Sequence, residues 1–451
     1  MTTMKHSSIR PTLLCKACQS GKTSEALYDW VTAQMRQTQG TIKARRIAFF
    51  ICDNSLLLTK QTTVRATDDL LALNGDVVTI SCKASIKRVS QLYNTITTNK
   101  VVNTIVCCGN NRRLQDLSEL LDLIYKLYDV YEFYIYVDEA DKVLHSKKAR
   151  EQAEIWRHHP LVEKLTLITA TPQENISKGL STDFGKLELH KMRSILADTY
   201  QGLRDCIHID TPTISKITNV EYAEEVLLHM AEPKIGEVWF IPGEHKVITH
   251  DEMQTMLFKK GFNCVMKING QKKEITYLKG IKQNADELEY DVETKTFKDI
   301  HEECVLAGNE EFSPYNNEIS RWLGHYYSKN DGQNKWKFAI TGNVCISRGI
   351  SLQSPECYIT HAIFGPACSR SNAGKYQIYA RVCGNVEKFP GYIKHGPSKV
   401  ITHRRAFKKI CKMENLAVNL ATISVGSQLG HKPVVIENPE QLEELEIDLE
   451  A

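Results

Sequence analysis

The chain has 451 residues, of which 25% are charged and 42% are apolar, as in ordinary globular proteins of two or three domains. It has no apolar run near the roughly 20 residues that span a bilayer and no apolar signal core at its start, so we expect a soluble, intracellular protein. Residues 437–451 carry seven acids and no base. The remaining 57 basic and 47 acidic side chains give a net charge of +10, which suits a polyanionic partner or a simple solvated surface.

Strand-like and helix-like runs alternate in the first half of the chain, a pattern that predicts a parallel sheet with crossover helices. The predicted strands are residues 12–16, 46–52, 77–82, 103–108, 134–137 and 165–169. The clearest helix is at 114–128, where apolar side chains recur with a period of 3.6 residues. We therefore expect one α/β domain at residues 1–210, followed by a linker at 211–235 that contains Thr211-Pro212-Thr213.

A second alternation predicts a second α/β domain at residues 236–420. Its expected strands are 237–241, 263–268, 337–340 and 357–364, and its expected helices are 250–260 and 318–327. The polar, weakly periodic stretch at 270–315 is interpreted as an insertion with a hairpin at Asn269-Gly270. Residues 421–451 are expected to form a tail with an acidic, disordered or helical end that could bind a protein partner.

A phosphate-binding turn is predicted near the N-terminus. The strand-like run at 12–16 is followed by Gln19-Ser20-Gly21-Lys22-Thr23-Ser24 and then by a helical pattern, the place where backbone N–H groups cradle phosphates. Lys22 would reach the β- and γ-phosphates of ATP, and the Thr23 hydroxyl would complete the coordination of Mg²⁺. The full phosphate-loop pattern has a glycine five residues before Gly21, where this chain has Lys16.

An acidic motif, Asp138-Glu139-Ala140-Asp141, follows the strand-like run at 134–137. Asp138 is placed to hold Mg²⁺, and Glu139 is placed to polarise an attacking water. Such a run could instead be a solvated helix start, because carboxylates favour that end of a helix. The two motifs each follow a strand in one α/β domain, however, and together they predict a site that hydrolyses ATP.

Three later segments resemble motifs of the superfamily 2 helicases, in the order that is fixed in that family. They are Thr169-Ala170-Thr171, residues 338–342 with 347–352, and residues 376–384. The resemblance implies two tandem RecA-like domains, each with a parallel sheet, that bind ATP and nucleic acid across a cleft. It implies a coupling role between the two ligands for Thr169, Thr171, Thr341, Arg348 and Gly349. Gln377 and Arg381 would act in hydrolysis, with Arg381 stabilising charge on the γ-phosphate.

The chain departs from the family pattern in its last motif. Ala380 stands in place of a glycine, and Gly384 stands where a second arginine is expected. Arg348, Arg370 or Lys388 could substitute for that arginine. No adenine-reading glutamine motif precedes the phosphate loop, so the chain resembles divergent phage and large-DNA-virus members more than DEAD-box RNA helicases. As a viral protein it would act in the host cell, in the cytoplasm or nucleus.

Candidate nucleic-acid contacts lie in three basic segments. Arg112 and Arg113 follow a predicted strand, and residues 54–65 include Lys60 and Arg65. Residues 403–412 form a third basic run. Solvated loops and the outer face of a helix would give the same patterns. We expect single-stranded DNA or RNA as the partner, with DNA favoured.

The predicted function is that of an ATP-dependent helicase or translocase with Mg²⁺ as cofactor. One alternative is a packaging-type ATPase with a nuclease in its second half, which would need convergent carboxylates for two metals. The acids of the second half lie mainly in the predicted insertion instead. Another alternative is a nucleic-acid-binding scaffold that binds ATP as a switch and hydrolyses it slowly, which the glycine at 384 keeps open.

Overall fold

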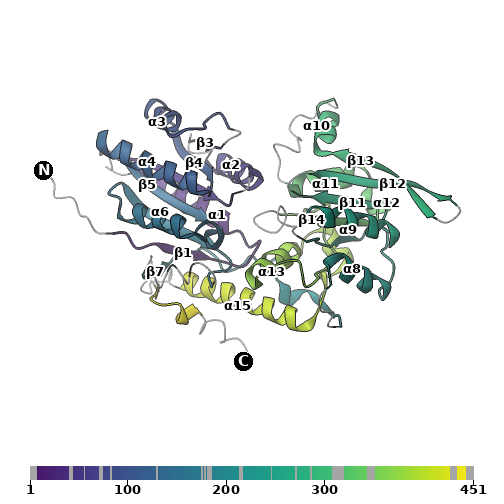
Figure 1. Ribbon diagram of the computed structural model, residues 1–451. Coiled ribbons are helices and arrows are strands. Elements are labelled where there is room, and N and C mark those ends of the chain that lie inside the picture. The colour runs from purple at the N-terminus through teal and green to yellow at the C-terminus, as the bar shows by residue number, and fades with distance from the viewer. Residues whose placement is uncertain are drawn as a thin grey trace. The chain divides into compact units, whose positions relative to one another are not determined.

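The structure is a computed structural model that consists of two compact units. It describes residues 8–442 apart from 40–43, 55, 71–74, 82–83, 128–130, 174–175, 177–178, 180–184, 213–216, 245, 270–271, 285–286, 307–318, 343–350 and 427–433. Unit 1 comprises Met1–Leu196 and Asn415–Ala451, and unit 2 comprises Ala197–Glu414. Each unit is built on its own eight-stranded sheet (Figure 1).

The sheet of unit 1 has the strand order β18-β7-β1-β6-β5-β2-β4-β3. Its strands are β1 (Thr12–Cys15), β2 (Arg45–Cys52), β3 (Asp76–Ile80), β4 (Val102–Cys108), β5 (Tyr131–Asp138), β6 (Val162–Thr169), β7 (Leu187–Leu189) and β18 (Val435–Ile436). All neighbouring strands are parallel except β18, which pairs antiparallel with β7. All six strands expected in the first half of the chain are present, because long runs of buried apolar residues are a strong strand signal.

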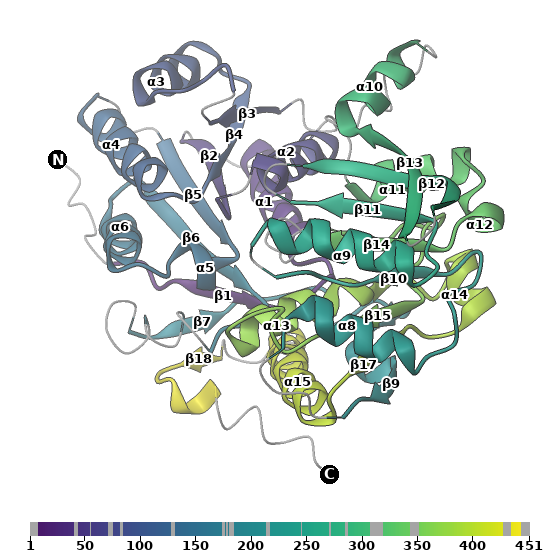
Figure 2. The same ribbon diagram turned by 45° about the vertical axis from the view of Figure 1, so that its right-hand side comes forward.

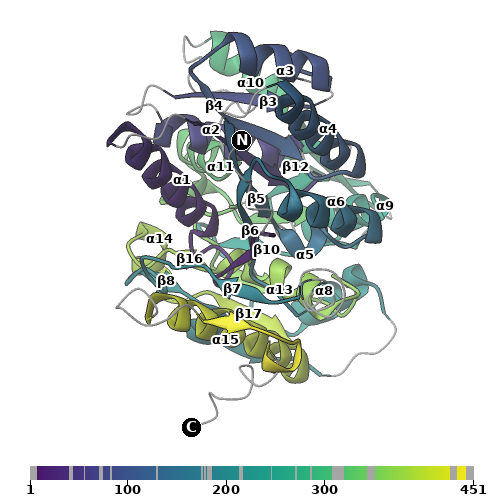
Figure 3. The same cartoon turned by 90° about the vertical axis from the view of Figure 1, so that its left-hand side faces the viewer.

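Helices cover both faces of this sheet. They are α1 (Lys22–Gln39), α2 (Leu56–Leu70), α3 (Val89–Thr98), α4 (Asn111–Leu127), α5 (Ala140–Val143), α6 (Lys147–His158) and the second half of α15 (Arg404–Gly426). Successive strand residues point to opposite faces, so Phe49 lies in the buried cluster that contains Trp156 of α6, while Phe50 lies in the cluster that contains Trp30 of α1. Figure 3 shows α1 on one side of the sheet and α4 and α6 on the other.

The sheet of unit 2 has the strand order β13-β12-β11-β14-β10-β15-β17-β9 (Figure 2). Its strands are β9 (Ile207–Asp210), β10 (Val238–Phe240), β11 (Cys264–Ile268), β12 (Lys273–Asn284), β13 (Glu287–Thr296), β14 (Phe338–Gly342), β15 (His361–Ile363) and β17 (Lys399–Thr402). The pairs β11–β12 and β12–β13 are antiparallel, and the others are parallel. Two short strands, β8 (Tyr200–Gln201) and β16 (Gly384–Asn385), form a separate antiparallel pair.

The faces of the second sheet are also covered by helices. They are α8 (Asn219–Leu228), α9 (Ile248–Lys259), α10 (Phe297–Leu306), α11 (Ile319–Lys329), α12 (Gly332–Lys335), α13 (Asn372–Tyr379) and α14 (Pro390–His395), with 3₁₀ turns at Leu203–Asp205 and Ala380–Val382. Trp239 of β10 packs in the cluster of α8 and α9. Its neighbour Phe240 packs on Phe364, which stacks on Tyr379 of α13 at 4.0 Å. No helix in the described part of either unit has the length and apolar character needed to cross a membrane.

The boundaries of the two units differ from the domain boundaries predicted from the sequence. The strand β9 belongs to unit 2, not to the expected first domain, because its backbone pairs with β17. The expected tail after residue 420 is part of unit 1, since Ala421 of α15 and Ile436 of β18 lie in its core and β18 pairs with β7. The expected hairpin at residue 269 joins β11 to β12, and the expected insertion adds β12 and β13 to the second sheet.

Candidate active site

Three of the sequence motifs lie at one edge of the sheet of unit 1. The phosphate loop follows β1, the acidic motif ends β5, and the threonine motif ends β6, which lies between the other two strands. In the register of these strands, Leu14, Ile168 and Asp138 form one row. Because parallel strands end at the same edge, loops from distant parts of the chain meet there, as ligand sites of open α/β sheets do.

The loop between β1 and α1 has the backbone of an anion cradle. Gln19 and Gly21 have φ angles of 61° and 88°, in the left-handed region, and α1 begins directly afterwards at Lys22. The Ser20 hydroxyl donates a hydrogen bond of 2.6 Å to the Ala17 carbonyl, and Lys22 Nζ donates one of 3.4 Å to the same oxygen. The first N–H groups of a helix have no partner within the helix, so this turn can bind a phosphate. Ser24 is exposed in the first turn of α1.

Lys16, which stands in place of a glycine in the phosphate-loop pattern, points into the protein. Its ammonium group lies 3.9 Å from the Glu25 carboxylate and donates a hydrogen bond of 3.4 Å to the Ser194 hydroxyl. Burial lowers the pKa of Lys16, and Glu25 opposes that shift. Glu25 also accepts a hydrogen bond of 2.7 Å from the backbone N–H of Arg193. Lys16 therefore fixes the base of the loop to α1 and to the segment after β7.

Thr23 and Asp138 bring the two halves of the predicted site together. The Thr23 hydroxyl donates a hydrogen bond of 3.1 Å to Oδ2 of Asp138, whose Oδ1 accepts one of 3.0 Å from the N–H of Glu139. Burial raises the pKa of Asp138, while the charge of Lys22 and the hydrogen bond from Thr23 oppose the shift. A hydroxyl and a carboxylate are oxygen ligands of the kind that Mg²⁺ prefers, so this pair fits the predicted metal.

Glu139 has a backbone conformation that glutamate rarely adopts. Its φ and ψ angles are 51° and 48°, in the left-handed region, and its side chain is 3% exposed. Such a conformation costs about 1 kcal/mol or more and persists where the surrounding structure enforces it. Here it turns the chain sharply from β5 into α5, next to the Thr23–Asp138 pair.

Asp141 joins the acidic motif to the threonine motif. Its two carboxylate oxygens accept hydrogen bonds of 2.9 Å each from the hydroxyls of Thr169 and Thr171, and all three residues are buried. The predicted coupling threonines thus bind the acidic motif directly. No role for Asp141 was predicted from the sequence, although it belongs to the acidic motif and lies only three residues after Asp138.

The basic residues predicted to contact nucleic acid differ in their surroundings. Arg112 is exposed at the start of α4, whereas Arg113 is buried and donates hydrogen bonds to Asp116 at 2.6 Å and to the Lys87 carbonyl at 3.0 Å. Lys60 is exposed on α2. The first arginine and this lysine are therefore accessible to a polyanion, while Arg113 is held in place within unit 1.

The residues of unit 2 that resemble helicase motifs are mostly buried. Thr341 is the last residue but one of β14, and its hydroxyl has no hydrogen-bond partner among the described residues. Arg381 Nε donates a hydrogen bond of 2.9 Å to the carbonyl of Gln377, and both side chains are at most 2% exposed. Arg348 and Gly349 lie outside the described residues. The alternative cations Arg370 and Lys388 are both exposed.

The glycine at position 384 has a structural reason. Gly384 pairs with Gln201 in the short β8–β16 ladder, and its φ angle is 142°. A side chain at this φ is strained. The backbone conformation at position 384 therefore favours glycine over the second arginine that the family pattern has there.

Comparison with known proteins gives matches of fold and none of sequence. No protein-family profile and no curated protein matches the chain. The chain is similar to the DEAD-box helicase Mss116 bound to ssRNA and UDP-BeF, with a TM-score of 0.50 and 12% identity over 89% of this chain and 68% of that chain. It also matches S. cerevisiae Dbp5 bound to RNA and ADP BeF3, with a TM-score of 0.46 and 13% identity over 97% of this chain and 88% of that chain. The expected fold is confirmed: the chain has two tandem RecA-like domains of the kind found in helicases.

Proposed function

We propose that this protein is a nucleic-acid-dependent ATPase of helicase superfamily 2, acting as a helicase or translocase. The observation that carries the proposal is the Thr23–Asp138 hydrogen bond of 3.1 Å, which joins the phosphate loop to the acidic strand end at the edge where α/β sheets bind ligands. The RecA-like fold of both units agrees with it. The expected resemblance to phage and large-DNA-virus members remains a proposal within that superfamily.

Different residues of unit 1 would bind the phosphates of ATP, hold the metal ion and activate the attacking water. The N–H groups of Gln19, Ser20, Gly21 and Ser24 and the Lys22 ammonium group would bind the phosphates. Thr23 and Asp138 would hold Mg²⁺, which when bound neutralises charge on the β- and γ-phosphates. Glu139, at the turn beyond Asp138, would orient the attacking water and accept its proton.

Residues of unit 2 would complete the reaction. Arg381 would stabilise the charge that develops on the γ-phosphate, once it exchanges the Gln377 carbonyl for a phosphate oxygen. In unit 1, Asp141 would transmit changes at the acidic motif to Thr169 and Thr171. The family resemblance gives these two threonines a role in coupling ATP to the bound nucleic acid. This arrangement would connect hydrolysis to binding of the nucleic acid.

We propose single-stranded RNA as the nucleic-acid partner. Mss116 is described as bound to ssRNA, and nothing in the comparisons supports the DNA preference expected from the sequence. Arg112 and Lys60 would supply exposed positive charge in unit 1. The slow-turnover scaffold stays a second candidate, because the backbone at Gly384 disfavours a second arginine.

ATP hydrolysis measured with and without single-stranded RNA, single-stranded DNA and duplex DNA tests the proposal. We expect stimulation by a single strand, loss of turnover in Lys22→Ala and Glu139→Gln, and normal turnover in the matched control Glu151→Gln, an exposed glutamate of α6. Undetectable hydrolysis under all conditions, or full activity of Glu139→Gln, would refute a motor. ATP-enhanced RNA binding at background turnover would favour the scaffold.

A further inference from the structure

The backbone around Arg381 is held by glutamine side chains from two distant segments of unit 2. Arg381 lies in the 3₁₀ turn Ala380–Val382, which is closed by a hydrogen bond of 3.1 Å from the N–H of Cys383 to the Ala380 carbonyl. The carbonyls of the next three residues all accept hydrogen bonds from side-chain amides. Every carbonyl from residue 380 to residue 383 therefore has a donor within unit 2.

Gln353 supplies two of these hydrogen bonds. Its Nε2 donates to the carbonyl of Arg381 at 3.3 Å and to the carbonyl of Cys383 at 3.4 Å. Its Oε1 accepts a hydrogen bond of 3.0 Å from the N–H of Ile359. The reversed amide would place its oxygen against two carbonyls and its NH₂ group against an N–H, so these partners fix the orientation of the side chain. In the sequence, Gln353 directly follows residues 347–352, a segment that resembles a helicase motif.

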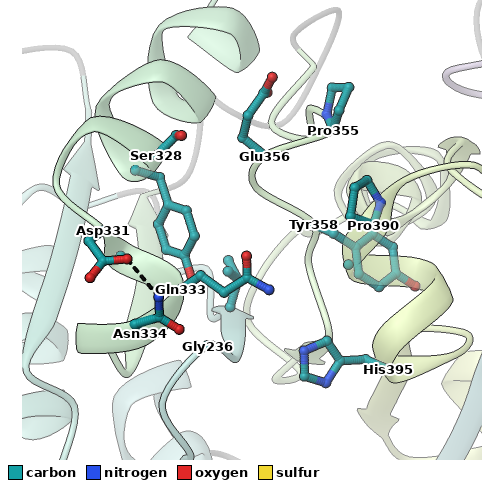
Figure 4. A pocket seen from close by; sticks show the side chains of 14 residues that line it. Gly236, Ser328, Asp331, Gln333, Asn334, Pro355, Glu356, Tyr358, Pro390 and His395 are labelled. Atoms are coloured by element: carbon teal, nitrogen blue, oxygen red, sulfur yellow. Dashed lines mark hydrogen bonds between the residues drawn. The ribbon is translucent and has the colours of Figure 1, made fainter.

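Gln201 supplies the third hydrogen bond. Its side chain is fully buried, and its Nε2 donates to the carbonyl of Val382 at 3.1 Å. Its Oε1 accepts hydrogen bonds of 3.3 Å each from the N–H of Ser398 and from the hydroxyl of Tyr358, a residue that also lines the cavity of about 320 Å³ in Figure 4. The backbone of Gln201 pairs with Gly384 in the β8–β16 ladder. Since Ser398 directly precedes β17, Gln201 ties the turn to the second sheet.

A fixed backbone matters for the role proposed for Arg381. An arginine side chain loses much rotamer freedom when it is held in one place, and a displacement of about 1 Å at a catalytic group can slow a reaction about 100-fold. The base of this side chain is also held, because its Nε donates a hydrogen bond of 2.9 Å to the Gln377 carbonyl one helical turn earlier. Only the guanidinium end of Arg381 would therefore have to be ordered when ATP is hydrolysed.

We propose that Gln353 is a positioning residue for Arg381, which holds the backbone of the turn so that the guanidinium group can meet the γ-phosphate. This inference rests on the proposed function, in which Arg381 stabilises charge on that phosphate. Gln353 acts through the two carbonyls and not by contact with ATP. Gln201 holds the same turn, but its replacement would empty a fully buried polar site and disturb folding. Gln353 is half-buried and is therefore the residue to change.

Steady-state ATP hydrolysis by Gln353→Ala and by Gln353→Met, which keeps the length of the side chain, tests the proposal. We expect kcat to fall about 10–100-fold in both variants, while KM for ATP stays within about threefold of the wild type. The matched control is Gln333→Ala, which changes an exposed glutamine of α12 that lines the cavity in Figure 4. This control should hydrolyse ATP at the wild-type rate.

A double-mutant cycle separates positioning of Arg381 from a general structural role of Gln353. If Gln353 acts through Arg381, the double variant Gln353→Ala/Arg381→Ala should be no more than about twofold slower than Arg381→Ala alone. Losses of kcat that multiply in the double variant would show that Gln353 acts elsewhere and would overturn the proposal. Wild-type kcat in both single variants of Gln353 would overturn it as well.

Hydrogen exchange tests the hold on the turn without ATP. The N–H of Cys383, which closes the turn, should exchange about tenfold faster in Gln353→Ala than in the wild type, while exchange in α8 stays the same. Equal exchange at Cys383 in the two proteins would contradict the positioning role. An active wild type with a fully active Gln353→Ala contradicts this inference alone, whereas a wild type without turnover contradicts the proposed function and this inference together.

Discussion

The hydroxyl of Thr23 donates a hydrogen bond of 3.1 Å to the carboxylate of Asp138, across 115 positions of sequence. Thr23 lies in the first turn of α1, and Asp138 ends β5. Strand β6 lies between β1 and β5 in the sheet, so this hydrogen bond connects the helix after one strand to the end of a non-adjacent strand. The two oxygen ligands proposed for Mg²⁺ are thus already oriented toward each other.

Removal of the Thr23 hydroxyl should weaken the use of Mg²⁺. We expect Thr23→Ala to raise the Mg²⁺ concentration required for half-maximal ATP hydrolysis by about 10–100-fold, because one ligand and the hydrogen bond that orients the other are removed. Thr23→Ser keeps the hydroxyl and should stay within about threefold of the wild type. A magnesium titration of the ATPase rate checks this. Equal magnesium dependence of Thr23→Ala and wild type would contradict the assignment.

Glu414 should make the stability of unit 2 depend on pH. Burial raises the pKa of this carboxyl to about 7, although it accepts a hydrogen bond of 2.9 Å from the N–H of Leu203. The folded protein therefore holds a proton that the unfolded chain releases near its ordinary pKa. The free energy of unfolding should fall as pH rises from about 4.5 to about 7, by about 3 kcal/mol at most, and then level off.

The variant Glu414→Gln isolates this contribution. Its amide oxygen can still accept the hydrogen bond from Leu203, but it does not titrate. Urea unfolding at several pH values between about 5 and 8 should show a smaller fall in stability for the variant than for the wild type. Parallel profiles of the two proteins would show that Glu414 is ionised throughout this range.

The strands and the motifs at their ends could be predicted from the sequence because both are local signals. A buried parallel strand is a run of apolar residues, and the phosphate loop and Asp138 follow such runs directly. The partners of Lys16 and Asp141 could not be predicted, since Ser194 and Thr171 are fixed by strand order. The placement of β18 in unit 1 likewise depends on a backbone pairing with β7 that no local pattern contains.

Replacement of Gly384 by the arginine of the family pattern should destabilise the protein. Because the φ angle of Gly384 is 142°, we expect Gly384→Arg to lower the free energy of unfolding by about 1–3 kcal/mol and to leave ATP turnover no higher than in the wild type. Gly384→Ala is the control: it should lose a similar amount of stability, because the strain comes from the backbone. A variant with arginine at this position that is stable and hydrolyses ATP faster would show that the missing second arginine limits the rate.

The exposed basic face of α15 should contribute to binding of nucleic acid. Its cations recur at helical spacing on one side of the helix: Arg404, Arg405, Lys408, Lys409 and Lys412. We expect the double variant Lys408→Glu/Lys412→Glu to weaken binding of single-stranded RNA. It should also reduce the slope of log affinity against log salt by about 0.7 for each phosphate that is no longer neutralised.

Lys259→Glu, which replaces an exposed lysine at the end of α9, is the control for this double variant and should leave the slope unchanged. Fluorescence anisotropy of labelled single-stranded RNA between about 50 and 200 mM salt measures both the affinity and the slope. Because the slope counts neutralised phosphates, it separates a direct role of these lysines from an indirect effect on folding. An unchanged slope in the double variant would show that these lysines do not contact the RNA.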